Sequence, residues 1–141
     1  MPYSPLLVKP MKEELTEIGF TDLLTGDAVD SAMEKAKSGV TLVAINSVKG
    51  VAAGMARPGV RIALENTSHR PDQLLTVFAD QDLEATDRMR SYFADIPPSD
   101  PSFALFKDGE LVYFIPRHRI EGRDANAVAS DLQAALDEFG Q

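Results

Sequence analysis

The sequence predicts an α/β fold in which a four-stranded mixed sheet carries helices on both faces, with two extra helices at the N-terminus. Two apolar runs, at 41–45 and 74–79, flank a helical stretch, which is typical of a right-handed parallel strand–helix–strand unit. Two further runs, at 102–106 and 111–115, enclose an Asp-Gly pair, which is a strong hairpin signal. A parallel unit and a hairpin in one sheet make that sheet mixed, with helices packed on its two faces.

The first forty residues predict two helices. Pro10 suits the first turn of a helix over 11–18, because its ring fixes φ and its missing N–H is not needed there. A second helix continues to residue 37, and either Thr25 or Asp27 can cap its N-terminus with a side-chain oxygen. Its apolar side consists of Ala28, Val29, Ala32, Met33 and Ala36.

The central part of the chain predicts two buried strands joined by a helix. The runs 41–45 and 74–79 are continuously apolar, as expected for strands that are covered on both faces. Between them, residues 50–65 form a helical pattern that contains Pro58. Proline removes the hydrogen bond to the Gly54 carbonyl, so we expect a kink at this point.

Two more helices are expected after the second strand. Asp80 or Asp82 can cap the first of them. One side of this helix is formed by Leu83, Thr86, Met89, Arg90 and Phe93. A proline-rich connection leads to the hairpin, and Asp124 can cap the last helix. The apolar face of the last helix consists of Val128, Leu132, Ala135, Leu136 and Phe139.

Length and charge limit the class of protein. A chain of 141 residues suits one domain, which we expect to span residues 1–141. No apolar run approaches the ~18–20 residues of a membrane span, and the first residues lack a secretory signal pattern, so we expect a cytoplasmic location and no membrane partner. The net charge of −8 argues against nucleic acid as a partner, since phosphate binding needs clustered Lys and Arg. The one basic cluster, Arg117-His118-Arg119 with Arg123, is flanked by acids and indicates a solvated loop.

The side-chain inventory limits the chemistry further. The chain has no cysteine, which excludes disulfides, thiol nucleophiles, thiolate zinc sites and iron–sulfur clusters. His69 and His118 lie far apart and show no metal-ligand spacing, and neither a Ser-His-Asp order nor a phosphate-binding loop is present. We therefore expect no metal, no cofactor and no catalytic residue of these classes.

Several stretches resemble a known family. The stretch at 101–115, PSFALFKDGELVYFI, resembles the proline–strand–hairpin signature of thioredoxin folds, which implies that Pro101 is cis. Across the whole chain the resemblance narrows to the bacilliredoxins, small bacterial proteins with a thioredoxin-like fold. The matching blocks are VKPMKEELTEIGF, NSVxGxAAGMARP, VFADQDLEATDRMRSYF, PPSDPSFAL and FIPRHRIEG.

The chain departs from this family at the residues that carry its chemistry. Bacilliredoxins have Cys-Gly-Cys in the first strand-to-helix turn, where this chain has Lys49, Gly50 and Val51. The family activity is thiol–disulfide exchange, including release of bacillithiol from mixed disulfides, and it requires an attacking thiolate. The resemblance therefore implies no such activity at these positions. Lys and Val are not the size-preserving Ser or Ala chosen to remove a thiol, which favours natural divergence.

The resemblance also implies a groove between the turn and the loop that carries the cis-proline, in which backbone groups can receive a bound segment. The expected ligand or partner is a protein segment or a small anion, the latter held by Lys49 and the free amides of the helix N-terminus. We also expect an ion pair between Lys49 and Asp100 across the groove. The candidate residues are Val48, Lys49, Gly50, Val51, Ala52, Asp100, Pro101 and Ser102.

Other interpretations of the same residues stay open. Lys49 can simply lie in solvent, Val51 can fill the space of a sulfur, and Pro101 can do no more than fix its turn. The chain could be an enzyme of another class that uses Lys49 or Asp80 in the groove. Alternatively, a thiol redox role could be assigned to it only because its family has that role. Val48 and Val51 could also form the face of a homodimer. Arg57 is expected to bond carbonyls around the Pro58 kink rather than a ligand.

Overall fold

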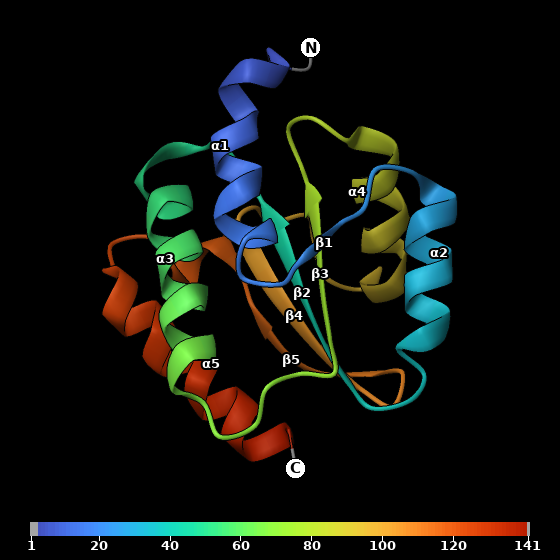
Figure 1. Cartoon of the computed structure of the whole chain (residues 1–141), viewed down its shortest axis with the longest axis vertical. Helices are drawn as coiled ribbons and strands as arrows, with labels where there is room; N and C mark the ends of the chain where they lie inside the picture. The colour runs from blue at the N-terminus through green and yellow to red at the C-terminus, as the bar shows by residue number, and fades with distance from the viewer. Residues whose placement is uncertain (1–2, 141) are drawn as a thin grey trace.

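The computed structural model describes residues 3–140 and is organised around a sheet with strand order β1-β3-β2-β4-β5 (Figure 1). The first three strands in this order run parallel, whereas β4 is antiparallel to β2 and β5 is antiparallel to β4. The strands are β1 (Thr21–Asp22), β2 (Val40–Asn46), β3 (Gln73–Phe78), β4 (Ser102–Lys107) and β5 (Glu110–Ile115). The predicted mixed α/β sheet is thus confirmed, with one strand more than expected.

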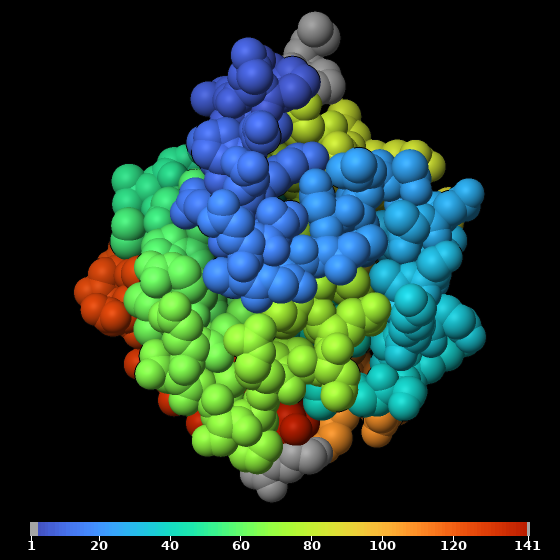
Figure 2. All heavy atoms as spheres, viewed as in Figure 1, coloured from blue at the N-terminus to red at the C-terminus, as the bar shows by residue number. Residues whose placement is uncertain are grey.

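The helices lie on both faces of this sheet. They are α1 (Pro5–Thr16), α2 (Gly26–Lys35), α3 (Gly50–Asn66), α4 (Leu83–Arg90) and α5 (Ala125–Phe139), with short 3-10 helices at Ser91–Phe93 and Arg117–Arg119. Helices α1, α3 and α5 share one apolar core with the sheet, and α2 and α4 share another. Figure 2 shows α1 and the segment after it lying over the front of the molecule. No helix within residues 3–140 is long and apolar enough to cross a membrane.

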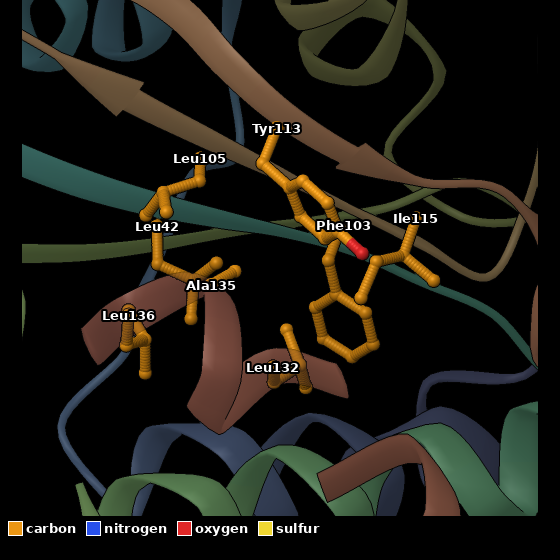
Figure 3. Close-up of a pocket in the computed structure, with 8 residues that line it drawn as sticks. All are labelled: Leu42, Phe103, Leu105, Tyr113, Ile115, Leu132, Ala135 and Leu136. Carbon is orange, nitrogen blue, oxygen red and sulfur yellow. The ribbon is translucent and has the colours of Figure 1, made fainter. Parts of the chain in front are cut away.

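Strand β2 explains why the core has two layers. All of its residues are buried, as its unbroken apolar run predicts. Successive side chains point to opposite faces, so Leu42 packs with α3 and α5, while Val43 and Ile45 pack with α2 and α4. Between β4, β5 and α5 lies a void of about 10 Å³, lined by apolar side chains and Tyr113 (Figure 3). This volume holds at most one water, so it is a packing defect and not a ligand site.

Local chemistry accounts for the helix starts and the hairpin. The Oγ1 of Thr25 accepts a hydrogen bond from the Ala28 N–H, and Asp124 caps α5 through the Ala127 N–H, as predicted. Asp108, in the two-residue loop between β4 and β5, has a φ of 50°, and Gly109 beside it has a φ of 85°. Positive φ at both central residues is what a type I′ turn requires, and it confirms the hairpin.

Helix α1 begins earlier than predicted. It starts at Pro5, with the Ser4 side chain accepting from the Leu6 N–H, and Pro10 lies inside the helix instead of in its first turn. Pro5 serves at the first helical position, where a missing N–H costs nothing. Because residues 6 and 10 are exposed, water can reach the carbonyl that Pro10 leaves free.

Two further expectations need correction. The extra strand β1 pairs in parallel with β3, Thr21 opposite Leu75, and a strand of two polar residues carries no pattern that a sequence could show. Leu83 was expected on the apolar side of α4 but is 53% exposed, and Ala85 is buried in that layer instead. Phe139 is partly buried against the core, as predicted.

Candidate functional site

The candidate site is built on the buried turn that follows β2. Ser47 is completely buried, and its N–H donates to the Asn46 side-chain oxygen at 2.9 Å. Its hydroxyl donates to Asp80 Oδ2 at 2.9 Å and accepts from the Lys49 N–H at 2.9 Å. Asp100 Oδ2, at 3.3 Å, is a second acceptor for the same hydroxyl proton. One serine therefore links the turn to both carboxylates of the site.

Asp80 supports the turn and does not cap a helix. Its Oδ2 accepts from the Val48 N–H at 2.8 Å as well as from Ser47. Asp82 occupies the N-cap position of α4 without a capping hydrogen bond, because its carboxylate binds Lys12 Nζ at 2.7 Å. The prediction that Asp80 or Asp82 caps a helix is thus wrong. The Asp80 carboxylate accepts hydrogen bonds from Ser47 and Val48, and the Asp82 carboxylate accepts one from Lys12.

The predicted Lys49–Asp100 ion pair is present. Lys49 Nζ lies 3.2 Å from Asp100 Oδ2 and 3.6 Å from Asp80 Oδ1. The two carboxylate side chains are only 12% and 8% exposed, whereas the Lys49 side chain is 55% exposed. Arg90 completes the group, with Nη2 at 3.1 Å from Asp100 Oδ1. Two buried negative charges are therefore balanced by two cations that differ in exposure.

This arrangement keeps Lys49 charged. The hydrogen bond from its ammonium to Asp100, together with the charges of Asp100 and Asp80, raises the pKa of Lys49 above its ordinary value. A lysine nucleophile needs the opposite, a desolvated amine with a lowered pKa. Asp80 Oδ2 is likewise occupied by two donors, so neither residue has the environment of a catalytic group.

Arg117 joins the two segments that carry the candidate residues. Its Nη1 donates to the Asp100 carbonyl at 2.8 Å and to the Lys49 carbonyl at 3.4 Å. A Cβ on Gly50 would lie 3.2 Å from Arg117 Nη2, and the φ of Gly50 is +66°, so glycine suits this position on both grounds. The basic cluster of 117–119 is thus not simply a solvated loop. Its first residue bridges the turn and the Asp100–Pro101 loop.

Arg57 holds the turn from behind. This residue is 8% exposed, and its Nη1 donates to the Ser47 carbonyl at 2.7 Å and to Asn46 Oδ1 at 3.2 Å. Its Nε binds Glu14 of α1 at 2.9 Å. The structural role predicted for Arg57 is confirmed, but the carbonyl it bonds belongs to the turn and not to the helix around Pro58. The kink at Pro58 itself stays a prediction.

The remaining predicted site residues divide into an exposed tip and a buried base. Val51 is 77% exposed, so it does not fill the interior space suggested for it, and Val48 is half-buried. The base consists of Ala52, Pro101 and Ser102, all buried. The Asp100–Pro101 bond is cis, as the resemblance implies, and Ser102 Oγ donates to the Ser99 carbonyl at 2.7 Å. The eight predicted residues therefore do lie on the two facing segments.

Two residues of the site, Arg90 and Arg117, were not expected from the sequence. Arg90 is the charged residue on the otherwise apolar or small side of α4. A charged side chain in such a position indicates that it has a partner in the fold. Arg117 belongs to a charged run whose partners lie far away in the sequence. Within residues 3–140 no group of three or more His, Asp or Glu is placed to hold a metal ion.

A sheet with a crossover helix, a hairpin and a cis-proline facing the first strand-to-helix turn defines a thioredoxin-like protein. Thioredoxin from Fasciola hepatica has the same fold, with a TM-score of 0.60 at 15% identity over 85% of this chain and 99% of that one. Oxidised thioredoxin O2 from Arabidopsis thaliana is similar, with a TM-score of 0.60 at 16% identity over 89% and 97% of the two chains.

Sequence comparison narrows this class to one family. The family described as Disulphide isomerase matches residues 3–140. A bacilliredoxin from Salinibacter ruber is 52% identical over 139 residues, covering 99% of this chain and 82% of the relative. A bacilliredoxin from Cytophaga hutchinsonii is 51% identical over 137 residues, covering 97% and 99%. The chain belongs to the bacilliredoxin family, and it has no cysteine.

Proposed function

We propose that this bacilliredoxin-family chain is a binding module without thiol–disulfide exchange activity, and that it engages a protein segment between residues 48–52 and the Asp100–Ser102 loop. The observation that carries the binding proposal is the 77% exposure of Val51 in the first of these two segments. An apolar side chain so exposed gains free energy when a partner covers it. The proposed absence of thiol–disulfide exchange rests on the lack of any cysteine, because the chain has no thiolate to attack a disulfide.

The charge balance favours a protein segment over a small anion. Lys49 is the N-cap residue of α3, and Asp100 and Asp80 already neutralise its ammonium. An anion would have to compete with two fixed carboxylates for that ammonium. A segment that covers Val51 and lies along the loop needs no free charge.

The redox part is tested by insulin reduction. Purified protein with excess dithiothreitol is expected to precipitate insulin no faster than dithiothreitol alone. A relative that has the Cys-Gly-Cys turn serves as the positive control. A clear acceleration by this chain would contradict the proposal.

The binding part is tested by selecting peptides from a displayed random library and mapping them by ¹H–¹⁵N NMR. The expected shifts fall on the amides of 48–52 and of Asp100 and Ser102. Val51→Ser should weaken the selected peptides several-fold, because less apolar area is covered. Leu83→Ser, at an apolar residue of α4 that is 53% exposed, is the matched control and should leave affinity unchanged. Shifts confined to another surface would contradict the proposal.

A further inference from the structure

The guanidinium of Arg117 lies where the turn after β2 meets the loop before β4. Its Nη1 donates to the Asp100 carbonyl at 2.8 Å and to the Lys49 carbonyl at 3.4 Å, so one nitrogen reaches both segments. The backbone of Arg117 is fixed as well, because its N–H donates to Ser99 Oγ at 2.7 Å. A Cβ on Gly50 would lie 3.2 Å from Nη2, so the guanidinium also packs closely against the start of α3. A single side chain therefore bridges the turn and the loop.

This bridge occupies a backbone group that a bound segment would need. An extended segment binds beside a loop through main-chain hydrogen bonds to the backbone groups of that loop. Pro101 is buried and has no N–H, and Ser102 is a buried residue of β4. The Asp100 carbonyl is therefore the acceptor that this loop offers to a segment. Arg117 already bonds it.

The contacts of Arg117 are compatible with its release. Its side chain is 29% exposed, and its Nε lies 3.5 Å from Oε1 of Glu121, whose side chain is 54% exposed. The bond to the Lys49 carbonyl, at 3.4 Å, is at the long end of the hydrogen-bonding range. A guanidinium that moves outward enters water and keeps the Glu121 carboxylate nearby, so its charge stays solvated.

We propose that Arg117 is a latch, which occupies the Asp100 carbonyl in the unbound protein and which a bound segment displaces into solvent. The inference rests on the proposed function and specifies how binding at that site is regulated. A segment can bind only the fraction of molecules in which the latch is open. The closed latch therefore raises the apparent dissociation constant by the reciprocal of that fraction. On binding, a backbone N–H of the segment replaces the guanidinium as donor to Asp100.

The turn keeps its other supports when the latch opens. Asp80 still accepts from the Ser47 hydroxyl and the Val48 N–H, and Arg57 still donates to the Ser47 carbonyl. None of these bonds involves Arg117. The opening is thus confined to one side chain and does not require the turn to unfold.

The test compares Arg117→Met with the wild type and uses as probes the peptides selected from the random library on the wild-type protein. Methionine keeps most of the stem and cannot donate to either carbonyl. The affinity should rise about tenfold, which corresponds to a latch that is closed in about nine-tenths of the molecules. Arg117→Ala, which adds no apolar side chain to the surface, should give the same rise. Arg119→Met is the matched control and should leave the affinity unchanged, because Arg119 bonds the Tyr113 hydroxyl and Asp131 instead.

A measurement without peptide tests the latch itself. The Asp100 carbonyl loses its donor in Arg117→Met, so its ¹³C chemical shift should move upfield, whereas Arg119→Met should leave that shift in place. An Asp100 shift that responds equally to both variants would overturn the inference. Peptides that bind the wild type and Arg117→Met with equal affinity at the two segments would overturn it while leaving the proposed function intact. A library that yields no binder at these segments for either protein would overturn both.

Discussion

The guanidinium of Arg57 donates a 2.7 Å hydrogen bond to the backbone carbonyl of Ser47. Arg57 lies in α3 and Ser47 directly follows the last residue of β2, so this bond closes the turn between them from the inside. The same nitrogen also reaches Asn46 Oδ1, whose carboxamide in turn orients the Ser47 N–H. The candidate site thus depends on a buried cation that no ligand would touch.

We predict that Arg57→Met destabilises the protein by about 2–4 kcal/mol, because it removes the side-chain donor to the buried Ser47 carbonyl and to the Glu14 carboxylate, and one of the two donors to Asn46 Oδ1. Arg61→Met is the matched control on the same helix. Arg61 is about half exposed and pairs with Glu65 at 3.7 Å, so its loss should cost no more than ~0.5 kcal/mol. Urea unfolding followed by circular dichroism measures both. Equal costs would contradict this view of Arg57.

Two glycines of α3 should respond in opposite ways to alanine. A Cβ on Gly59 would lie 2.7 Å from Val128 Cγ1 and 3.2 Å from the Ala125 carbonyl of α5, so Gly59→Ala should cost about 1–3 kcal/mol. A Cβ on Gly54 meets nothing within 4 Å, so Gly54→Ala should stabilise by about 0.5–1 kcal/mol through its helix propensity. Thermal unfolding of the two variants shows whether each substitution lowers or raises the stability of the protein. A stabilising Gly59→Ala would show that α3 and α5 pack less closely.

The ammonium of Lys49 should titrate above the ordinary lysine pKa of 10.5, because Asp100 and Asp80 stabilise its charged form. A pKa that folding raises contributes stability that is complete below the unfolded value and is lost as pH rises through the folded value. The contribution of Lys49 should therefore vanish only in alkaline solution.

Heteronuclear NMR of the Lys49 side chain measures this titration. Asp100→Asn should lower the pKa of Lys49 more than Asp80→Asn does, because Asp100 supplies the largest effect. The reverse order would show that the ammonium lies closer to Asp80 in solution.

Lys49→Cys with Val51→Cys should restore thiol chemistry to the turn. Neither side chain forms the bonds that fix the backbone here, which come from Asn46, Ser47, Asp80 and Arg57. We expect the double variant to form an intrachain bridge that opens and closes in a glutathione titration, followed by mass spectrometry. The two single variants are the controls and should form only mixed disulfides. A double variant that gives only mixed disulfides would show that the turn no longer brings these positions together.

Much of the fold follows from local signals in the sequence. The unbroken run of β2, the Asp108-Gly109 turn and the cap at Asp124 each act within a few residues, and each was predicted correctly. The start of α1 was misplaced because Pro10 is compatible with two positions in a helix. Strand β1 was missed because its pairing with β3 is created by tertiary contact and not by its two residues.

The candidate site was predictable only where the family resemblance supplied the topology. It placed Asp100 opposite Lys49, and the ion pair follows from their opposite charges. The assignments of Asp80 and Asp82 failed because a capping rule considers only neighbouring amides. Their actual partners, Val48 and Lys12, come from other elements. Arg117 was missed for the same reason, since its acceptors are carbonyls on distant segments.

The support of the turn has a consequence for protein engineering. The groups that fix its backbone lie beneath and beside it, so the side chains at 49 and 51 can be exchanged with little effect on those supports. The scaffold therefore offers two adjustable positions on a rigid platform at the start of a long helix. A laboratory could install selenocysteine, a metal-binding amino acid or a photoreactive group there and obtain a predefined orientation for each.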